Sequence, residues 1–317
     1  MKIMSDKDFK EKLNAVNQFK LSKDTNLIEL IANLKKTGFN AKRLALACEI
    51  YEKMVKDKEC VKFFGLAGAM VPVGMQGILY DFIAEGFIDI LVTTGANLTH
   101  DIAEALGYHH LQGEVDLNEV DDKSLHQTEM NRIYDVFMPN EVYEGIEDFV
   151  SQLDIPDYHM SVSSFLKYLG EKIPGDKKSI LKICAEKEVP IFCPAFTDSG
   201  LALQIGFHHQ KINLNHFKDM LKMVDLAWDA KRAGVCIAGG GVPKNFIFQS
   251  LQFCPNSASY AIQITMDRPE PGGLSGASLR EAMSWGKINE QAKYSTVIAD
   301  ATIALPIILW YLKQSLL

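Results

Sequence analysis

Short apolar runs alternate with segments of helical spacing along most of this chain, and each run ends in small or polar residues. The runs are rich in β-branched and aromatic residues, as expected of buried strands. They lie at residues 61–66, 87–94, 189–194, 234–238, 260–265 and 296–299. Strands separated by helices pair in parallel, because each connection carries the chain back across the sheet. The sequence therefore predicts an α/β fold with a doubly wound, mostly parallel sheet.

The segments outside this alternation have different patterns. Residues 5–57 have the spacing of two or three amphipathic helices, most clearly around Leu27, Leu30 and Ile31. Residues 108–160 are polar and poorly patterned, so we expect loops and short helices there.

No linker, repeat or low-complexity tract divides the chain. We therefore expect one domain over residues 1–317. It comprises a helical N-terminal extension at 1–57 and an α/β core at 58–317.

The formal net charge of −7 limits the classes of partner. Binding to nucleic-acid phosphates needs a cationic surface, so this charge argues against a nucleic-acid partner. It suits a cationic substrate better.

The six cysteines and eight histidines show no metal-ligand spacing, and we expect no metal site. The cysteines have mostly apolar neighbours, which is typical of buried, reduced thiols in a cytoplasmic protein. The charged residues 1–10 lack the apolar core of a signal peptide, and the apolar run 301–312 is too short to cross a bilayer.

Four of the predicted strands end in small or polar residues, at 65–68, 94–97, 197–200 and 239–241. Ligands of parallel sheets bind beyond the carboxyl ends of the strands, where helix N-termini favour anions. Such ends can hold a dinucleotide, but tight structural turns use the same residues. Asp198 and Asp300 lie at this edge, where a carboxylate can hold a ribose hydroxyl or cap a helix.

The segment 281–287 gathers the residues best suited to amine chemistry. On a helix, Glu281 and Trp285 share a face, and Gly286 ends the helix and redirects Lys287. A lysine that is partly desolvated beside an indole has a neutral, nucleophilic amine, which is the usual start of a Schiff base. The alternative, from the sequence alone, is a surface lysine and a half-buried tryptophan.

Several motifs in order along the chain resemble the deoxyhypusine synthase family, over roughly residues 60–310. The most specific is Ser-Trp-Gly-Lys at 284–287. The others are at 91–95, 131–133, 138–141, 189–198, 239–244, 275–277 and 299–301.

The resemblance implies a Rossmann-like fold, a homotetramer and NAD as cofactor. It implies transfer of a 4-aminobutyl group from spermidine, through an imine on Lys287, to a lysine of a translation factor. By match, Trp285, Glu281 and Asn245 bind the polyamine. The NAD site by match comprises Thr94, Gly95, Asp198, Gly239, Gly240, Ser275 and Asp300.

The chain departs from the family pattern where the family's acidic residues would hold substrate ammonium groups. Leu274 and Leu203 stand at two of these positions, and Asn245 replaces a histidine. An ammonium group without a partner is costly to bury. Two alternatives therefore stand beside protein modification: aminobutyl transfer between small polyamines, as in homospermidine synthase, and a non-catalytic NAD-binding protein.

Overall fold

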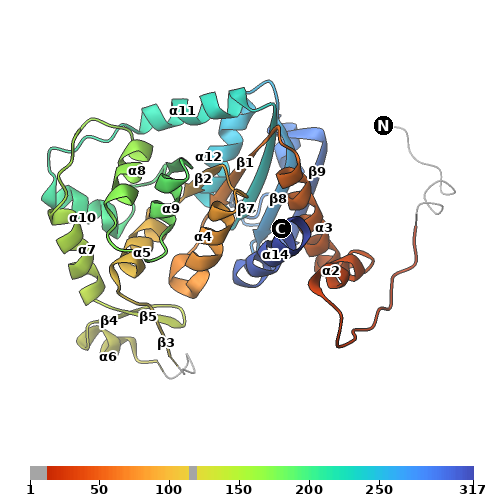
Figure 1. Ribbon diagram of the computed structural model, residues 1–317, viewed down its shortest axis with the longest axis horizontal. Helices are drawn as coiled ribbons and strands as arrows, with labels where there is room; N and C mark the ends of the chain where they lie inside the picture. Colours follow the sequence, from red (N-terminus) through yellow and green to blue (C-terminus); the bar gives the residue numbers. More distant parts are fainter. Residues whose placement is uncertain (1–12, 114–119) are drawn as a thin grey trace.

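The computed structural model describes residues 13–113 and 120–317. At its centre lies a six-stranded sheet in the order β6-β2-β1-β7-β8-β9, with every neighbouring pair parallel (Figure 1). The predicted α/β fold is confirmed. The strands are β1 (Cys60–Leu66), β2 (Ile90–Thr93), β6 (Ile191–Phe192), β7 (Arg232–Ala238), β8 (Ala258–Thr265) and β9 (Ile288–Ile298).

The strand order reverses once, between β1 and β7. From β1 the chain adds β2 and β6 on one side, then returns to place β7, β8 and β9 on the other. Such a switch point leaves a crevice at the carboxyl ends of the two central strands. The topology alone therefore marks the edge beyond β1 and β7 as the place for a ligand.

Helices cover both faces of the sheet, and strand residues alternate between the two resulting cores. On β1, Phe63 packs into one cluster and Phe64 into the other, and both are fully buried. The cluster that contains Phe64 includes residues of α3 (Phe39–Lys56), α4 (Gln76–Ala84), α5 (Gly95–Leu106), α8 (Val162–Lys172), α9 (Ile180–Glu186) and α14 (Ala301–Leu316). The other includes residues of α11 (His216–Asp229) and α12 (Gly241–Gln252).

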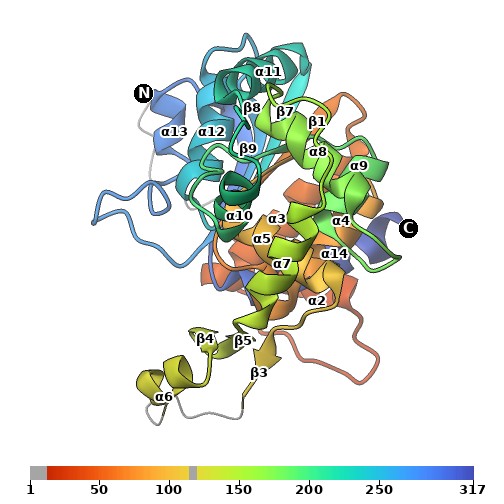
Figure 2. The same ribbon diagram turned by 90° about the vertical axis from the view of Figure 1, so that its left-hand side faces the viewer.

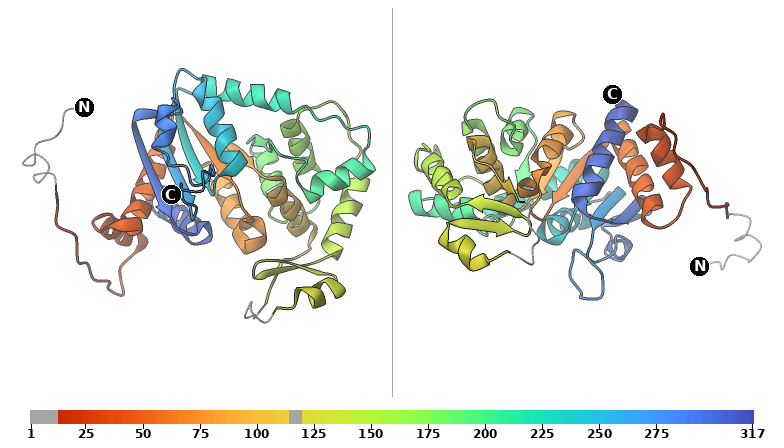
Figure 3. Two further views of the ribbon diagram at one scale, coloured as in Figure 1. Left: turned by 180° about the vertical axis from the view of Figure 1, so that it is seen from behind. Right: turned by 90° about the horizontal axis from the view of Figure 1, so that it is seen from below.

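The N-terminal part is helical over a shorter stretch than the sequence predicted. Residues 27–56 form α2 (Leu27–Lys35) and α3, which pack with α14 and β9 at one end of the sheet (Figure 3). Residues 13–26 form no helix, and their apolar side chains Leu13, Val16 and Leu21 are exposed. Without a surface on which to bury them, helical spacing alone does not stabilise a helix. Residues 5–12 of that prediction lie outside the described residues.

The middle of the chain is more regular than predicted. A small antiparallel sheet, in the order β3-β5-β4, projects from the body together with α6 (Asp122–Gln127) (Figure 2). Its strands are β3 (Leu111–Gln112), β4 (Met130–Ile133) and β5 (Val136–Pro139), and α7 (Glu141–Ser151) follows. Strands of two to four residues are too short to show a period in the sequence.

One other element differs from its predicted form. Strand β9 begins eight residues before the predicted strand at 296, and helix α10 (Gly200–His208) follows the loop 193–199 after β6. The first half of β9 is an exposed sheet edge rich in polar residues, so it has no apolar run. Among the described residues, none of the helices is both long and apolar enough for a membrane span. A single domain over 1–317 stays a prediction.

Candidate active site

A cavity of about 380 Å³ lies where the strand order reverses. Its wall comes from the residues that follow β1, β7, β8 and β9, including Ala67 and Gly68 after β1. Four residues that the sequence assigned to a cofactor line it together: Gly239, Gly240, Ser275 and Asp300. The structure therefore brings these four residues, which span 61 positions from 239 to 300, into one crevice.

The glycine turn after β7 is shaped by close backbone approach. Gly239 and Gly241 have φ of 78° and 57°, in the left-handed region that favours glycine. A Cβ on Gly240 would lie 2.4 Å from the Cα of Ser275, so this position has no room for a side chain. Helix α12 begins at Gly241, and its free N–H groups and dipole make this wall suitable for phosphate. The crevice thus fits the anionic part of a dinucleotide.

The other three predicted cofactor residues lie further along the same edge, beyond β1. Thr94 and Gly95 follow β2, and Asp198 follows β6, the neighbouring strand. A Cβ on Gly95 would lie 2.5 Å from the Cβ of Ser199, so the two turns touch. None of the three lines the 380 Å³ cavity.

The two aspartates at this edge differ in their hydrogen bonds. Asp300 Oδ1 accepts from the Thr302 N–H and hydroxyl at 2.8 Å each, so Asp300 is the N-cap of α14. Ser199, and not Asp198, caps α10, and the Asp198 carboxylate is exposed. Of the two roles weighed for these residues, Asp300 performs the capping role, and Asp198 remains available to a ligand.

A buried lysine and a buried glutamine hold the crevice wall in place. Lys244, in the first turn of α12, is 4% exposed, and its Nζ donates to Gln263 Oε1 at 3.0 Å. It also donates to the carbonyl oxygens of Leu274 at 2.9 Å and Ala277 at 2.6 Å. Gln263 Nε2 donates to the carbonyl oxygens of Gly239 and Ser275 at 2.9 and 2.8 Å. Together they tie the glycine turn to the 274–277 loop.

Neither Gln263 nor Lys244 was predicted from the sequence as a site residue. A signal for Gln263 exists, because it is a polar residue inside an apolar strand, between Ile262 and Ile264. Burial lowers the pKa of Lys244, the carboxylate of Glu281 raises it and the positive charge of Lys287 lowers it, with a net value of about 8. The three charged groups therefore share one electrostatic neighbourhood.

Gly286 ends α13 (Glu281–Ser284) and sets the direction of Lys287, as the sequence predicted. The N–H of Gly286 donates to Met283 O and that of Lys287 to Ala282 O, each at 3.0 Å, and Gly286 has a φ of 68°. This is the Schellman pattern of a helix end. Lys287 directly precedes β9, and its carbonyl oxygen accepts from the N–H of Ala258 at the amino end of β8.

Lys287 lies over the indole of Trp285, with Nζ 5.2 Å from the ring centroid. Trp285 is 58% exposed and Lys287 is half-buried; among the lysines of residues 13–113 and 120–317, Lys244 is the buried one. Helix α13 packs against the core cluster that also contains α12 residues, through Ala282 and Met283 (Figure 2). Lys287, the lysine predicted from the sequence to be catalytic, is therefore on the face of the sheet that α12 covers.

A second and larger cavity, of about 920 Å³, lies between β6, α11 and α12. Asn245 and Leu274, two of the positions that depart from the family pattern, line it. Gly241 lines both cavities, and Leu274 and Ser275, adjacent in the chain, line one each. The two cavities therefore meet at the glycine turn. Leu203 is 56% exposed on α10 and lines neither.

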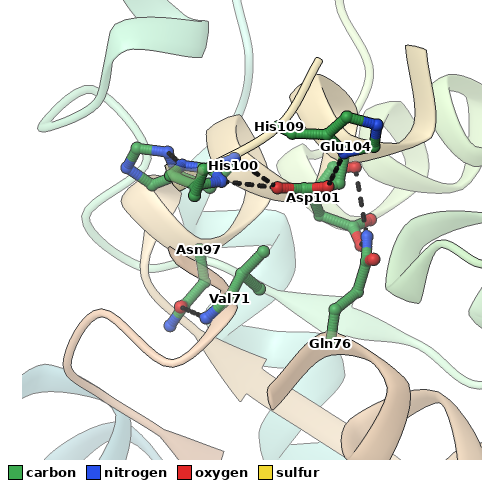
Figure 4. Close-up of polar contacts among 8 residues, drawn as sticks. Val71, Gln76, Asn97, His100, Asp101, Glu104 and His109 are labelled. Atoms are coloured by element: carbon green, nitrogen blue, oxygen red, sulfur yellow. Dashed lines mark hydrogen bonds and ion pairs between the residues drawn. The ribbon is translucent and has the colours of Figure 1, made fainter. Parts of the chain in front are cut away.

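Helix α5, which starts at the crevice edge, carries a polar network (Figure 4). Asp101 is fully buried and accepts from the N–H groups of Ile180 and Leu181, which anchors the start of α9. Glu104 accepts from His110 Nδ1 at 2.7 Å, and His110 Nε2 lies 2.8 Å from His100 Nδ1. This arrangement fixes α5 and the segment that leads to β3.

The strand order and the glycine-lined crevice at its switch point define a Rossmann-like α/β protein. The deoxyhypusine synthase family model matches residues 29–312, and the chain belongs to the deoxyhypusine synthase family. It is accordingly a transferase.

Curated relatives agree with this assignment along nearly their whole length. "Probable deoxyhypusine synthase 1" of Methanosarcina acetivorans is 45% identical over 293 residues, 91% of each chain. The protein of the same name from Archaeoglobus fulgidus is 44% identical over 285 residues, 90% of this chain and 93% of its own. The crystal structure of a "putative deoxyhypusine synthase" from Entamoeba histolytica has a TM-score of 0.63 at 18% identity, over 93% of this chain and 96% of its own, and shares the fold.

Proposed function

We propose that this enzyme transfers a 4-aminobutyl group from spermidine to an acceptor amine through an imine on Lys287, with NAD as cofactor. In the first form of the proposal the acceptor is a lysine of a translation factor, and the product is deoxyhypusine. The observation that carries the proposal is the position of Lys287, next to Trp285 and in the charge neighbourhood of Lys244 and Glu281, on the face of the sheet that α12 covers.

Bound NAD would take a hydride from the carbon next to the secondary amine of spermidine and later return it. In this proposal Gly239, Gly240, Ser275 and Asp300 hold it in the crevice. Thr94, Gly95 and Asp198 extend the site along the same edge of the sheet.

The residues around α13 act on the amine. The amine of Lys287 adds to the carbon of the oxidised donor, and the C–N bond to 1,3-diaminopropane breaks. Trp285 offers its ring face to an ammonium group, and Glu281 offers a carboxylate. Asn245, at the wall of the larger cavity, positions the substrate by hydrogen bonds, because an amide is not a base near neutral pH.

Borohydride trapping tests the nucleophile directly. Wild type incubated with spermidine and NAD should gain the mass of an aminobutyl group on the peptide that contains Lys287. Lys287→Ala should lose both the adduct and turnover, by at least about 10³-fold. Lys293→Ala, which removes an exposed lysine six residues along β9, is the matched control and should retain both. An adduct that persists in Lys287→Ala would contradict the proposal.

A second candidate is transfer to a small amine, as in homospermidine synthase. It is favoured by Leu274, which places an apolar side chain at the wall of the larger cavity. Assays with a translation-factor acceptor and with a panel of small amines, read by mass spectrometry, separate the two acceptors. Turnover with neither, together with intact NAD binding, would favour the third candidate, a non-catalytic NAD-binding protein.

The proposal also includes a cytoplasmic homotetramer. All six cysteines are free, and five of them are buried, as suits a reducing compartment. Apolar side chains at the surface of α14, such as Ile303 and Trp310, suit contacts between subunits. Light scattering should give four times the chain mass of 35.4 kDa.

A further inference from the structure

The crevice has no positively charged side chain of its own. Of the residues that the structure describes, those lining it include two carboxylates, Asp267 and Asp300, and no lysine, arginine or histidine. A dinucleotide carries an anionic diphosphate, and the dipole of α12 supplies only part of a unit charge to balance it. The two carboxylates act against such a ligand. Tight binding in this crevice therefore needs another source of positive charge.

The ammonium group of Lys244 lies one side-chain amide behind the crevice wall. Its Nζ donates to Gln263 Oε1 at 3.0 Å, and Gln263 Nε2 donates at 2.9 Å to the carbonyl oxygen of Gly239, which lines the crevice. The same Nζ donates to the carbonyl oxygen of Leu274, which directly precedes Ser275 in the wall. Because both Lys244 and Gln263 are buried, water screens the charge only weakly.

All the hydrogen-bond acceptors of this buried ammonium group are neutral. They are one side-chain amide and two main-chain carbonyls, and none is a carboxylate. The charged groups that act on Lys244 from neighbouring elements are Glu281 on α13 and Lys287 before β9, and their effects oppose each other. A buried cation without an anionic partner costs free energy. An anionic ligand in the crevice, on the other side of the wall, reduces that cost.

We propose that Lys244 is a positioning residue for the cofactor: from behind the glycine turn, its positive charge compensates the diphosphate of a bound dinucleotide. The inference rests on the proposed function for the identity of the ligand, NAD. If protonated Lys244 favours NAD, then bound NAD favours protonated Lys244, and the enzyme takes up a proton from solvent on binding. Burial is the main cause that lowers the pKa of Lys244 to about 8, which places this exchange in an accessible pH range.

Calorimetry of NAD binding between pH 6.5 and 9.5 tests the charge of Lys244. The affinity should be complete below the folded-state pKa of about 8 and fall as pH rises through it, by at least about tenfold at pH 9.5. At pH 8.5, heats measured in buffers of different ionisation enthalpy should show uptake of about half a proton per NAD. An affinity that does not change with pH, or binding without proton uptake, would overturn the inference, because a lysine that only ties the loop produces neither effect.

Lys244→Gln separates the charge from the hydrogen bonds. Glutamine can still donate to the loop carbonyls but carries no charge, so this variant should bind NAD about tenfold more weakly than wild type at pH 6.5, without pH dependence. Lys222→Met is the matched control, because it removes an exposed lysine from α11, on the same face of the sheet, and should behave as wild type. A pH dependence that persists in Lys244→Gln would refute the assignment, and the wild-type measurements decide if this variant does not fold.

Lys287→Ala separates failure of the inference from failure of the proposed function. It removes one positive charge that acts on Lys244, so the pH dependence of NAD binding should persist with its midpoint at higher pH. Loss of the pH dependence in Lys287→Ala would assign the titration to Lys287 and contradict the inference. PH-dependent NAD binding with proton uptake, but without any imine trapped on Lys287, would instead contradict the proposed function. Absence of NAD binding at every pH would contradict both.

Discussion

Lys244 has the most unusual surroundings of the lysines that the structure describes. Its amine is buried, donates to two main-chain carbonyls and one amide, and feels the charges of Glu281 and Lys287. A lysine side chain normally keeps its charge in water. Burying the Lys244 amine costs free energy, and its hydrogen bonds fix the loop that carries Leu274 and Ser275.

Lys244→Met tests this role through pH. Burial lowers the folded-state pKa to about 8, below the unfolded value of 10.5, so the folded protein releases this proton first. The unfavourable contribution of the charged amine is complete below pH 8 and is lost as pH rises to 10.5. The unfolding free energy of wild type minus that of Lys244→Met should therefore grow by about 1–3 kcal/mol over this range. Denaturant titrations at several pH values measure this difference in unfolding free energy. A difference that does not change with pH would contradict the lowered pKa of Lys244.

At the scale of elements, the start of α12 depends on glycine for close approach. Gly240→Ala places a methyl group 2.4 Å from the Ser275 Cα, so the turn or the loop has to move. We expect a loss of about 2–4 kcal/mol in stability and weaker NAD binding. Gly206→Ala is the control, since nothing lies within 4 Å of its Cβ position in α10, and it should be neutral or stabilising. Calorimetry of both variants with NAD decides; equal affinities would contradict the prediction.

The histidines that join α5 to the segment before β3 predict an acid-sensitive element. Burial, together with the charge of His110, lowers the pKa of His100 to about 4, and Glu104 acts in the opposite direction. Burial opposes the change in Glu104, but hydrogen bonds from His110 and His109 lower the pKa of Glu104 to about 2. Both groups then bind protons more readily in the unfolded chain, so folding stability falls as pH decreases.

His100→Gln isolates the histidine contribution. The stability of wild type relative to this variant should fall by about 1–3 kcal/mol as pH decreases from 6.5 to 4, the window between the unfolded and folded pKa values. His126→Gln, at an exposed position of α6, should show no such window. Imidazole NMR titration gives a second measurement, and a His100 pKa near 6.5 would refute the prediction.

At the scale of the whole molecule, the crevice lies between the two halves of the sheet, because β1 and β7 belong to different halves. A ligand bound there contacts the ends of strands from both halves, and it stabilises only the folded chain. NAD at about 100 times its dissociation constant should add about 2.7 kcal/mol and raise Tm by roughly 5 °C. Thermal scans with and without NAD test this, and Gly240→Ala should reduce the shift.

Much of the sheet could be predicted from the sequence because most of its strands are buried. The strands β1, β7 and β8 are covered on both faces, so each is an apolar run that sequence periodicity detects. The first half of β9 and the short strands β3, β4 and β5 are exposed or brief, so they show no such run. For residues 13–26 the prediction failed in the opposite direction. The sequence has helical spacing there, but no helix forms and the apolar side chains have no surface to pack against.

The sequence by itself determined the chemistry available to this protein: the glycine turns, the helix end at Gly286 and the lysine that follows it. Local rules suffice for these, since a left-handed residue or a helix end depends on its near neighbours. Only the tertiary structure decided which groups meet. Lys244 is buried because Gln263, Leu274 and Ala277 fold over it from 19 to 33 positions away, and such distant contacts leave no local pattern in the chain.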